Sequence, residues 1–367
     1  SRQQVATVRG WRLERLLAPG VDDVFFTVGA VSDAVREWRR SAGAGKTAVP
    51  PVEVLRAHAS SEVMPCMLAS WPGHVWSAKH GAPLDATQMG RALQVPDEYL
   101  AAVPALARDP RISECDVRQM MGQGTQGSCV RVALREALDG LQGSRWWKGT
   151  AATIGQAGAG IGITAWQARA FLGGDASIAW LAEACPKCCA GLEVLTEQLD
   201  QQPALHQWAE SVALAGRSAY VDLELVTLGC AWASQAGNGA ETEATLRLLV
   251  LMMQGLARRR SRIVVVEQAG GLWDNAARPR LEAILLNAQA YQWRVLVISP
   301  HTHTQVGVRR RRVFYLGRRK AWQNRPAALA DVAAAGGGNG SMQAAGAEAV
   351  EVVEEMTVAA EVAEAET

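Results

Sequence analysis

The sequence contains no apolar run of the ~18 residues that a membrane-spanning helix needs, so it predicts no membrane segment. It also carries almost no net charge, because 37 Lys and Arg balance 36 Asp and Glu to leave +1. Its seven cysteines are an odd number in a long chain that opens with no secretory signal, so a disulfide framework is not expected. We therefore expect an intracellular protein, nuclear or organellar in a eukaryote and cytoplasmic in a bacterium.

The chain has 367 residues, enough for one large α/β domain or two smaller ones, and its apolar fraction of 49% is typical of a folded globular protein. Charge is unevenly distributed along it. Basic clusters lie at 258–262 and 309–320, whereas the end of the chain from Glu348 is acidic and contains no Lys or Arg. This asymmetry can signal nucleic-acid binding. Charge runs alone, however, favour the alternative of two solvated faces and a solubilising tail.

Three apolar runs, at 219–226, 262–267 and 293–298, predict buried strands. Apolar residues at helical spacing predict helices at 242–259 and 277–290 between them. Strands that alternate with helices form a doubly wound α/β sheet, and functional residues in such sheets lie where strands end. Cys230 and Glu267 both lie at or just past a predicted strand end.

The flanking regions are less regular. Prolines predict loops between 50 and 83. From Leu84 the chain is predicted to be mostly helical, with a helix over 127–141. The segment 327–367 is a low-complexity acidic tail, which we expect to be disordered.

A glycine-rich turn at Gly158, Gly160 and Gly162 precedes a predicted helix. Alternate glycines allow a ligand to approach the backbone closely and leave helix N–H groups free to bind it. Roughly twenty residues later, Glu183 follows the next predicted strand, where a carboxylate can bind a ribose hydroxyl pair. The combination predicts a nucleoside-containing cofactor without specifying which one.

Two strand-end residues are candidates for chemistry. Cys230 follows a buried strand in a Gly- and Ser-rich loop, as a nucleophile would, although most cysteines are small buried apolar residues. Glu267 closes an apolar strand, where a partly desolvated carboxylate suits a general acid, although a solvated carboxylate is the alternative. Arg310 and Arg312 fall on one face as they lead into a strand. The alternative for them is a solubilising edge.

The order of these features resembles that of the cytosine-C5 methyltransferases. The segment VDLELVTLGCAWASQAG resembles their strand and Pro-Cys-Gln loop, VVVEQAGGL resembles their Glu-Asn-Val block, and VRRRRVFYLG resembles their Gln-x-Arg-x-Arg block. The resemblance implies an α/β, Rossmann-like S-adenosylmethionine-dependent methyltransferase fold with a smaller target-recognition region.

Two further blocks stand in an unusual order. LDATQMGRALQVPDEY and VRQMMGQGTQGSCVRVALREAL resemble blocks that close the family's sequences, with Gly122 and Gln123 where Gly-Asn is expected. Here they come first, so the chain resembles a circularly permuted member opened after the Arg-x-Arg strand. The implied regions are a target-recognition-like region at 1–83, helical blocks at 84–149 and a catalytic domain at 150–326.

The resemblance implies a role for each matched residue. Cys230 would attack C6 of a flipped cytosine, Glu267 would protonate or hydrogen-bond N3, and Arg310 and Arg312 would hold the base or its phosphate. The residues implied to bind S-adenosylmethionine are Gly158, Gly160, Gly162, Glu183, Gly122 and Gln123. DNA is the expected substrate, with RNA as the alternative. No metal is expected, and a monomer is assumed.

Five positions depart from the family pattern: Gly158 replaces an aromatic residue, Gly229 a Pro, Ala231 a Gln, Gln268 an Asn and Val308 a Gln. These departures leave open a catalytically inactive, methyltransferase-like nucleic-acid-binding protein.

Two other classes compete. A nicotinamide oxidoreductase would use the same glycine turn, but it gives Cys230 and Glu267 no role. A zinc site around 185–189 would need a second pair of ligands, so we expect these cysteines to lie on a helix instead.

Overall fold

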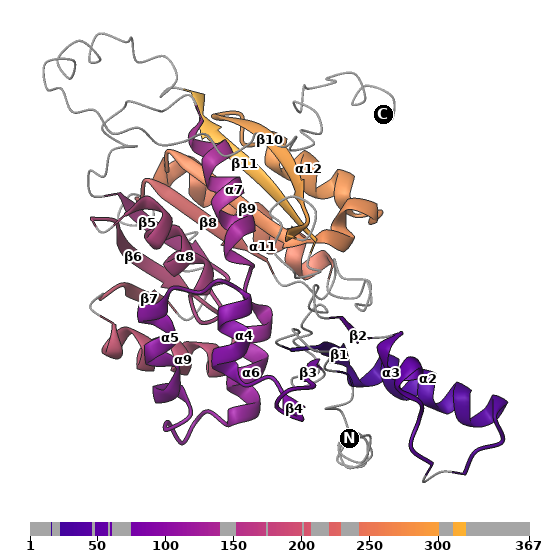
Figure 1. The fold of residues 1–367 in the computed structure, drawn as a ribbon. Helices are drawn as coiled ribbons and strands as arrows, with labels where there is room; N and C mark the ends of the chain where they lie inside the picture. Colours follow the sequence, from indigo (N-terminus) through magenta and orange to yellow (C-terminus); the bar gives the residue numbers. More distant parts are fainter. Residues whose placement is uncertain are drawn as a thin grey trace, which may run out of the picture.

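The computed structural model describes residues 16, 23–45, 48–57, 59–60, 75–139, 152–173, 175–199, 202–206, 220–228, 242–300 and 311–320. Its centre is a seven-stranded sheet with the order β10-β11-β9-β8-β5-β6-β7 (Figure 1). The strands are β5 (Thr153–Ala157), β6 (Ser177–Ala182), β7 (Ala204–His206), β8 (Leu223–Thr227), β9 (Ile263–Ala269), β10 (Tyr291–Ile298) and β11 (Arg312–Arg319).

Strand direction follows a simple rule in this sheet. The pairs from β7 to β9 are parallel, and β11 runs antiparallel to both β9 and β10. The three strands predicted from apolar runs are confirmed as β8, β9 and β10. Every residue of β9 is buried, as expected for a central strand that is covered on both faces.

Helices cover both faces of the sheet. On one face lie α7 (Gly127–Leu138), α8 (Ile163–Leu172) and α9 (Pro186–Gln198), which share a core with Leu225, Val265 and Phe314. On the other face lie α11 (Thr242–Arg259), the 3-10 helix η4 (Gly270–Asp274) and α12 (Arg278–Leu286). The predicted helix at 242–259 is confirmed. The one predicted at 277–290 is too long, because the chain turns after Leu286 to begin β10 at Tyr291.

A block of helices precedes the sheet in sequence and packs against it. It consists of α4 (Ala86–Ala92), α5 (Asp97–Leu106), α6 (Glu114–Gln123) and α7. Capping boxes begin α4 and α6, where Asp85 pairs with Gln88 and Ser113 with Asp116. The mostly helical character expected from Leu84 is confirmed, and the helix predicted over 127–141 ends at Leu138.

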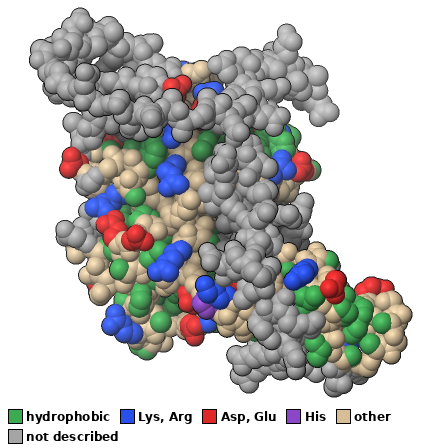
Figure 2. Space-filling view, viewed as in Figure 1, with side chains coloured by type: hydrophobic (Ala, Val, Ile, Leu, Met, Phe, Trp, Pro, Cys, Tyr) green, Lys and Arg blue, Asp and Glu red, His purple; other side chains and the backbone are tan. Residues whose placement is uncertain are grey.

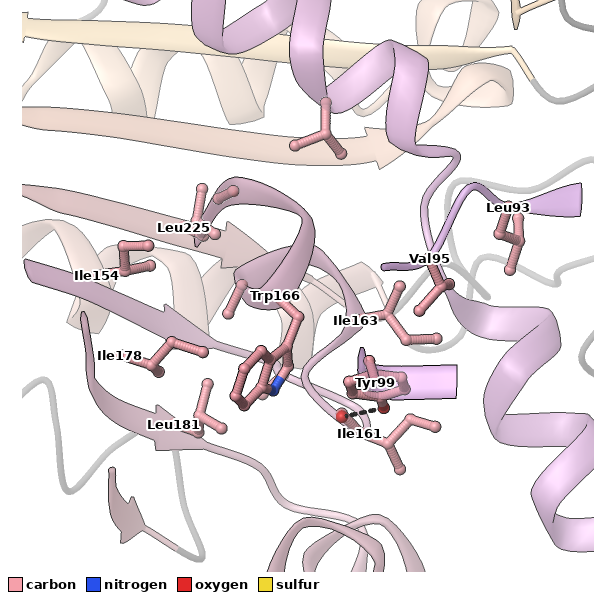
Figure 3. Close-up of a cluster of buried hydrophobic side chains, with 14 of the residues drawn as sticks. Leu93, Val95, Tyr99, Ile154, Ile161, Ile163, Trp166, Ile178, Leu181 and Leu225 are labelled. Carbon is pink, nitrogen blue, oxygen red and sulfur yellow. Dashed lines mark hydrogen bonds between the residues drawn. The ribbon is translucent and has the colours of Figure 1, made fainter. Parts of the chain in front are cut away.

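The helical block and the sheet form one continuous core. Tyr99 of α5 donates from its hydroxyl to the carbonyl of Ile161 at 2.6 Å and lies beside Trp166 of α8 (Figure 3). The side-chain amide of Gln167 donates to the carbonyls of Leu93 and Thr125, both at 2.9 Å. These bonds hold the start of α8 against the helical block.

A smaller sheet lies in the N-terminal part of the chain, with the order β2-β1-β3-β4 and antiparallel pairing throughout. Its elements are β1 (Phe25–Thr27), α2 (Val28–Ser41), α3 (Val52–Arg56), β2 (Ala59–Ser60), β3 (Val75–Ser77) and β4 (Ala82–Pro83). Phe26, Leu55 and Trp76 are fully buried in its core. The sequence predicted only loops over much of this region, because strands of two or three residues are too short for a recognisable apolar pattern.

Within the described ranges, no helix combines the length and apolar character that crossing a membrane requires. The low-complexity tail at 327–367, predicted to be disordered, lies outside the described residues.

Candidate active site

The candidate site lies at one edge of the seven-stranded sheet, where the carboxyl ends of its parallel strands meet. The glycine turn follows β5, Glu183 follows β6, Leu228 follows β8, and Glu267 lies near the end of β9. The chain winds outward from β5 through β6 on one side and continues with β8 on the other. In open α/β sheets, ligands bind at the carboxyl ends beside such a reversal.

The glycine turn has a left-handed backbone. The φ angles of Gly158, Gly160 and Gly162 are +65°, +57° and +83°. A Cβ atom at Gly158 would lie 1.8 Å from the carbonyl oxygen of Thr227, whereas one at Gly160 would meet nothing within 4 Å. No side chain therefore fits at Gly158 without a shift of the Thr227 backbone.

Glu183 lies directly beside the glycine turn. Its Oε2 accepts a hydrogen bond from the Gly160 N–H at 2.6 Å, and its Oε1 accepts from the N–H groups of Ala184 and Cys185 at 2.7 and 2.8 Å. The two predicted parts of a nucleoside site thus meet in space, and the space at Gly160 is open. Their role in cofactor binding remains a prediction.

The other two predicted cofactor residues, Gly122 and Gln123, end helix α6. Gly122 is buried and Gln123 is exposed. A Cβ atom at the next residue, Gly124, would lie 2.7 Å from Cδ1 of Ile163, the first residue of α8. The end of α6 therefore packs against the helix that follows the glycine turn.

Gln156 is a site residue that the sequence analysis missed. Its side chain is buried inside β5, where Oε1 accepts from the Ala165 N–H at 2.9 Å and Nε2 donates to Thr227 Oγ1 at 3.3 Å. It thereby ties the first turn of α8 to the end of β8. The sequence did contain a signal for it, because an amide side chain is unusual in a short strand of small and apolar residues such as β5.

Glu267 forms a buried ion pair with Arg312. Oε1 of Glu267 and Nε of Arg312 are 2.5 Å apart, and the two side chains are only 3% and 8% exposed. The atoms lack the alignment of a hydrogen bond, so the attraction is chiefly one of charge. Register places Phe314 opposite Glu267, which puts Arg312 on the same face of β11.

The neighbourhood of Glu267 also reaches β8. Nε2 of Gln268 donates to the carbonyls of Glu267 at 2.8 Å and Leu228 at 3.4 Å. A cavity of about 10 Å³, lined in part by Glu267, Thr227 and Thr164, lies between the sheet, α7 and α8. Its volume matches roughly one water molecule.

Two predicted catalytic residues, Cys230 and Arg310, lie outside the described residues. The described part of the chain ends at the buried Leu228 on one side of Cys230. Gln268 therefore contacts the end of the strand that leads into the predicted nucleophile loop. It makes this contact with the side chain that stands where the cytosine-C5 methyltransferase pattern has Asn.

One described residue of each basic cluster is buried, whereas Arg258, Arg260, Arg311 and Lys320 are exposed, as expected for solvated faces. Arg259 is fully buried, where its guanidinium pairs with Glu224, and Ser261 Oγ donates to the same carboxylate at 2.7 Å. Arg312 is buried against Glu267. Among the described residues on the face shown in Figure 2, Lys and Arg side chains are scattered rather than gathered in one place.

The predicted placement of the cysteines at 185–189 on a helix is confirmed, because Cys185 is the N-cap of α9 and Cys188 lies in its first turn. Among the described side chains, no three His, Cys, Asp or Glu residues gather as metal ligands would.

No family model and no curated protein matches this sequence. Solved structures do match. A Listeria monocytogenes protein assigned to the class I S-adenosylmethionine-dependent methyltransferases aligns with a TM-score of 0.39 and 10% identity over 64% of this chain and 88% of its own. The Dnmt2 methyltransferases of S. pombe and Spodoptera frugiperda each align with a TM-score of 0.35 over 46% of this chain, at 13% and 17% identity.

The chain spans about half the length of these Dnmt2 structures, 50% in each case. All three TM-scores are below 0.5, and the order and direction of the strands define the fold. One antiparallel strand, β11, lies between β9 and β10 in an otherwise parallel sheet. This is the Rossmann-like methyltransferase fold. The predicted fold class is confirmed, and the methyltransferase fold places the glycine turn and Glu267 at one edge of its sheet.

Proposed function

We propose that this protein transfers a methyl group from S-adenosylmethionine to C5 of cytosine in DNA, through a covalent adduct on Cys230. The observation that carries the proposal is a juxtaposition at one sheet edge. At that edge five strands lie side by side. The glycine turn follows β5 and Glu183 follows β6, β8 leads toward Cys230, and β9 and β11 carry Glu267 and Arg312.

The residues at the glycine turn fit the cofactor. Glu183 is partly exposed and accepts backbone N–H bonds, so its carboxylate is able to accept ribose hydroxyls as well. Gly160 leaves open space beside it. When bound, S-adenosylmethionine supplies an electrophilic methyl group. Tyr99 and Gln167 hold the backbone of the turn and of α8 in place.

The chain's own residues then carry out the chemistry on cytosine. The Cys230 thiolate adds to C6 of the flipped base, while Glu267, after taking up a proton from solvent, protonates or hydrogen-bonds N3 so that the ring accepts the electron pair. C5 becomes nucleophilic and takes the methyl group, with S-adenosylhomocysteine as the leaving group. Loss of the C5 proton to solvent and expulsion of the Cys230 thiolate restore the ring. Arg312 holds the Glu267 carboxylate in one orientation.

The permuted chain order is part of the same proposal. The guanidinium of Arg318, near the end of β11, donates from Nε to the carbonyl of Ala137 in α7 at 2.7 Å. The strand after which the chain would have been opened thus contacts the helical block that is displaced in sequence. Permutation joins the family's original ends, and here that closure needs only the residues between the end of α7 at Leu138 and the start of β5 at Thr153.

Calorimetric titration with S-adenosylmethionine and S-adenosylhomocysteine tests the cofactor step. We expect micromolar binding, about −8 kcal/mol. Methyl transfer to DNA and RNA then tests the reaction, with Cys230→Ala as the inactive control. Transfer to RNA alone would overturn the DNA assignment. Cofactor binding without transfer would favour an inactive methyltransferase-like protein, and no cofactor binding would refute the proposal.

A further inference from the structure

Two cysteines occupy paired positions at the start of α9. Cys185 is the N-cap and Cys188 lies three residues on, with Pro186 as the first helical residue. In a capping box, the side chains at the N-cap and at the third helical position lie over the same first turn. In this protein Ser113 Oγ donates to Asp116 Oδ2 at 2.6 Å from these two positions of α6. At α9 the same two positions hold two thiols, Cys185 and Cys188.

The environments of the two sulfurs differ. Cys185 is exposed and Cys188 is buried. Burial also raises the pKa of the Cys188 thiol, so this sulfur stays protonated while Cys185 is open to reagents. The neighbouring Cys189 is directed elsewhere, because its Sγ contacts the carbonyl of Glu183 at 3.4 Å.

We propose that Cys185 and Cys188 form a reversible disulfide at the edge of the cofactor turn, with a small-molecule disulfide of the glutathione class as oxidant. One helical turn from an extended N-cap brings two Cα atoms into the range of about 4.4–6.8 Å that a disulfide needs. All five described cysteines are free thiols, this pair included, so both sulfurs are available for the exchange.

The exchange proceeds in two balanced steps. The Cys185 thiolate attacks one sulfur of the small disulfide, which forms a mixed disulfide and releases one thiol. Cys188 then attacks the Cys185 sulfur and gives its proton to the departing thiolate, which leaves as the second thiol. The protein loses two hydrogens and two electrons, and the small disulfide gains them.

The disulfide would act on the site through Glu183. The Cys185 N–H donates to Glu183 Oε1 at 2.8 Å, and the other carboxylate oxygen holds Gly160. Closing the S–S bond moves the N-cap residue and so disturbs this carboxylate. The effect on the cofactor rests on the proposed function, whereas the disulfide does not.

Mass mapping of alkylated peptides tests the disulfide in the full chain, after treatment with oxidised glutathione or with dithiothreitol. We expect the oxidised peptide to carry a Cys185–Cys188 bond. Cys188→Ser should trap glutathione on Cys185, whereas Cys185→Ser should leave Cys188 unmodified. Cys115→Ser, which removes the exposed thiol of α6, is the matched control and should keep the bond. A bond to Cys115 or Cys189, or no bond, overturns the proposal.

Calorimetry on the reduced and oxidised forms tests the coupling separately. We expect S-adenosylmethionine to bind the oxidised wild type about tenfold more weakly, and the double variant Cys185→Ser/Cys188→Ser equally under both conditions. Equal affinity for both wild-type forms overturns the coupling. Absence of binding to the reduced protein refutes the cofactor assignment and its coupling, while peptide mapping still decides the disulfide.

Discussion

At the scale of single residues, Glu183 and Glu267 do most to shape the candidate site. Glu183 accepts backbone N–H bonds from both the glycine turn and the start of α9, so one carboxylate aligns two backbones. Glu267 is buried with Arg312 and lies beside the strand that leads to Cys230. Each carboxylate therefore has a structural partner as well as a proposed chemical role.

Glu183→Gln should weaken S-adenosylmethionine binding by about tenfold or more, because hydrogen bonds to charged groups contribute roughly 1.5–3 kcal/mol. Calorimetry measures the affinity. Glu193→Gln is the matched control, since this residue lies on α9 and its carboxylate pairs with the exposed Arg111. Equal losses for the two variants would contradict a specific role for Glu183.

Glu267→Gln should destabilise the fold by roughly 3–5 kcal/mol, since it leaves the buried Arg312 charge without its counter-charge. Adding Arg312→Met should recover part of that loss. Denaturant unfolding of Glu267→Gln, Arg312→Met and the double variant measures the coupling free energy between the two side chains. Additive free energies would show that the pair is not coupled.

The ion pair of Arg278 and Glu282 on α12 serves as the control for this burial, because its side chains are 27% and 20% exposed. Glu282→Gln should cost clearly less than Glu267→Gln, because both charges keep contact with solvent and the Gln carbonyl can still accept from the Tyr315 hydroxyl. If Glu282→Gln lowered the free energy of unfolding as much as Glu267→Gln does, burial would not explain the difference expected between the two ion pairs.

At the scale of elements, the turn between β5 and α8 is the most constrained segment. Its backbone lies against Thr227 at Gly158, and its helix is tied to the same residue through Gln156. The glycine turn and the strand that leads toward Cys230 are thus in direct contact, so a change in one should reach the other.

Gly158→Ala should therefore destabilise the protein severely, because a Cβ would lie 1.8 Å from the Thr227 carbonyl. Gly160→Ala is the matched control. It has a similar positive φ and no neighbour within 4 Å, so only the left-handed backbone cost of about 1–2 kcal/mol applies. Thermal unfolding compares the two, and equal losses would contradict the close approach at Gly158.

At the scale of the whole molecule, the helical block and the seven-stranded sheet share a single core. Buried tyrosines take part in it and in the core on the other face. Three of the four tyrosines, Tyr99, Tyr291 and Tyr315, are buried. Burial raises the pKa of each above the ordinary 10.0.

This burial predicts a loss of stability in alkali. Below about pH 10 these phenols are neutral in both the folded and the unfolded chain, so they contribute no pH dependence. Above it the unfolded chain releases protons that the folded chain retains, and the free energy of unfolding falls as pH rises. Thermal unfolding across this range measures the slope. Tyr99→Phe should flatten it more than a change at the exposed Tyr220, and equal slopes would contradict the prediction.

The sequence predicted the long elements well, for a local reason. The apolar runs of β8, β9 and β10 and the helical spacing of α11 are properties of adjacent residues. The glycine turn and Glu183 could be matched because their spacing along the chain is short. In contrast, Tyr99 donates to Ile161, 62 residues away, and no local pattern indicates such a bond.

The sequence by itself determined the alternation of strands and helices and the glycines of the turn, since both depend on local backbone preference and apolar periodicity. Only the tertiary structure decided that β11 lies between β9 and β10, that Arg259 and Arg312 are buried with carboxylates, and that Gly158 lies against Thr227. Each of these depends on which distant segments meet, because packing and charge pairing act through space rather than along the chain.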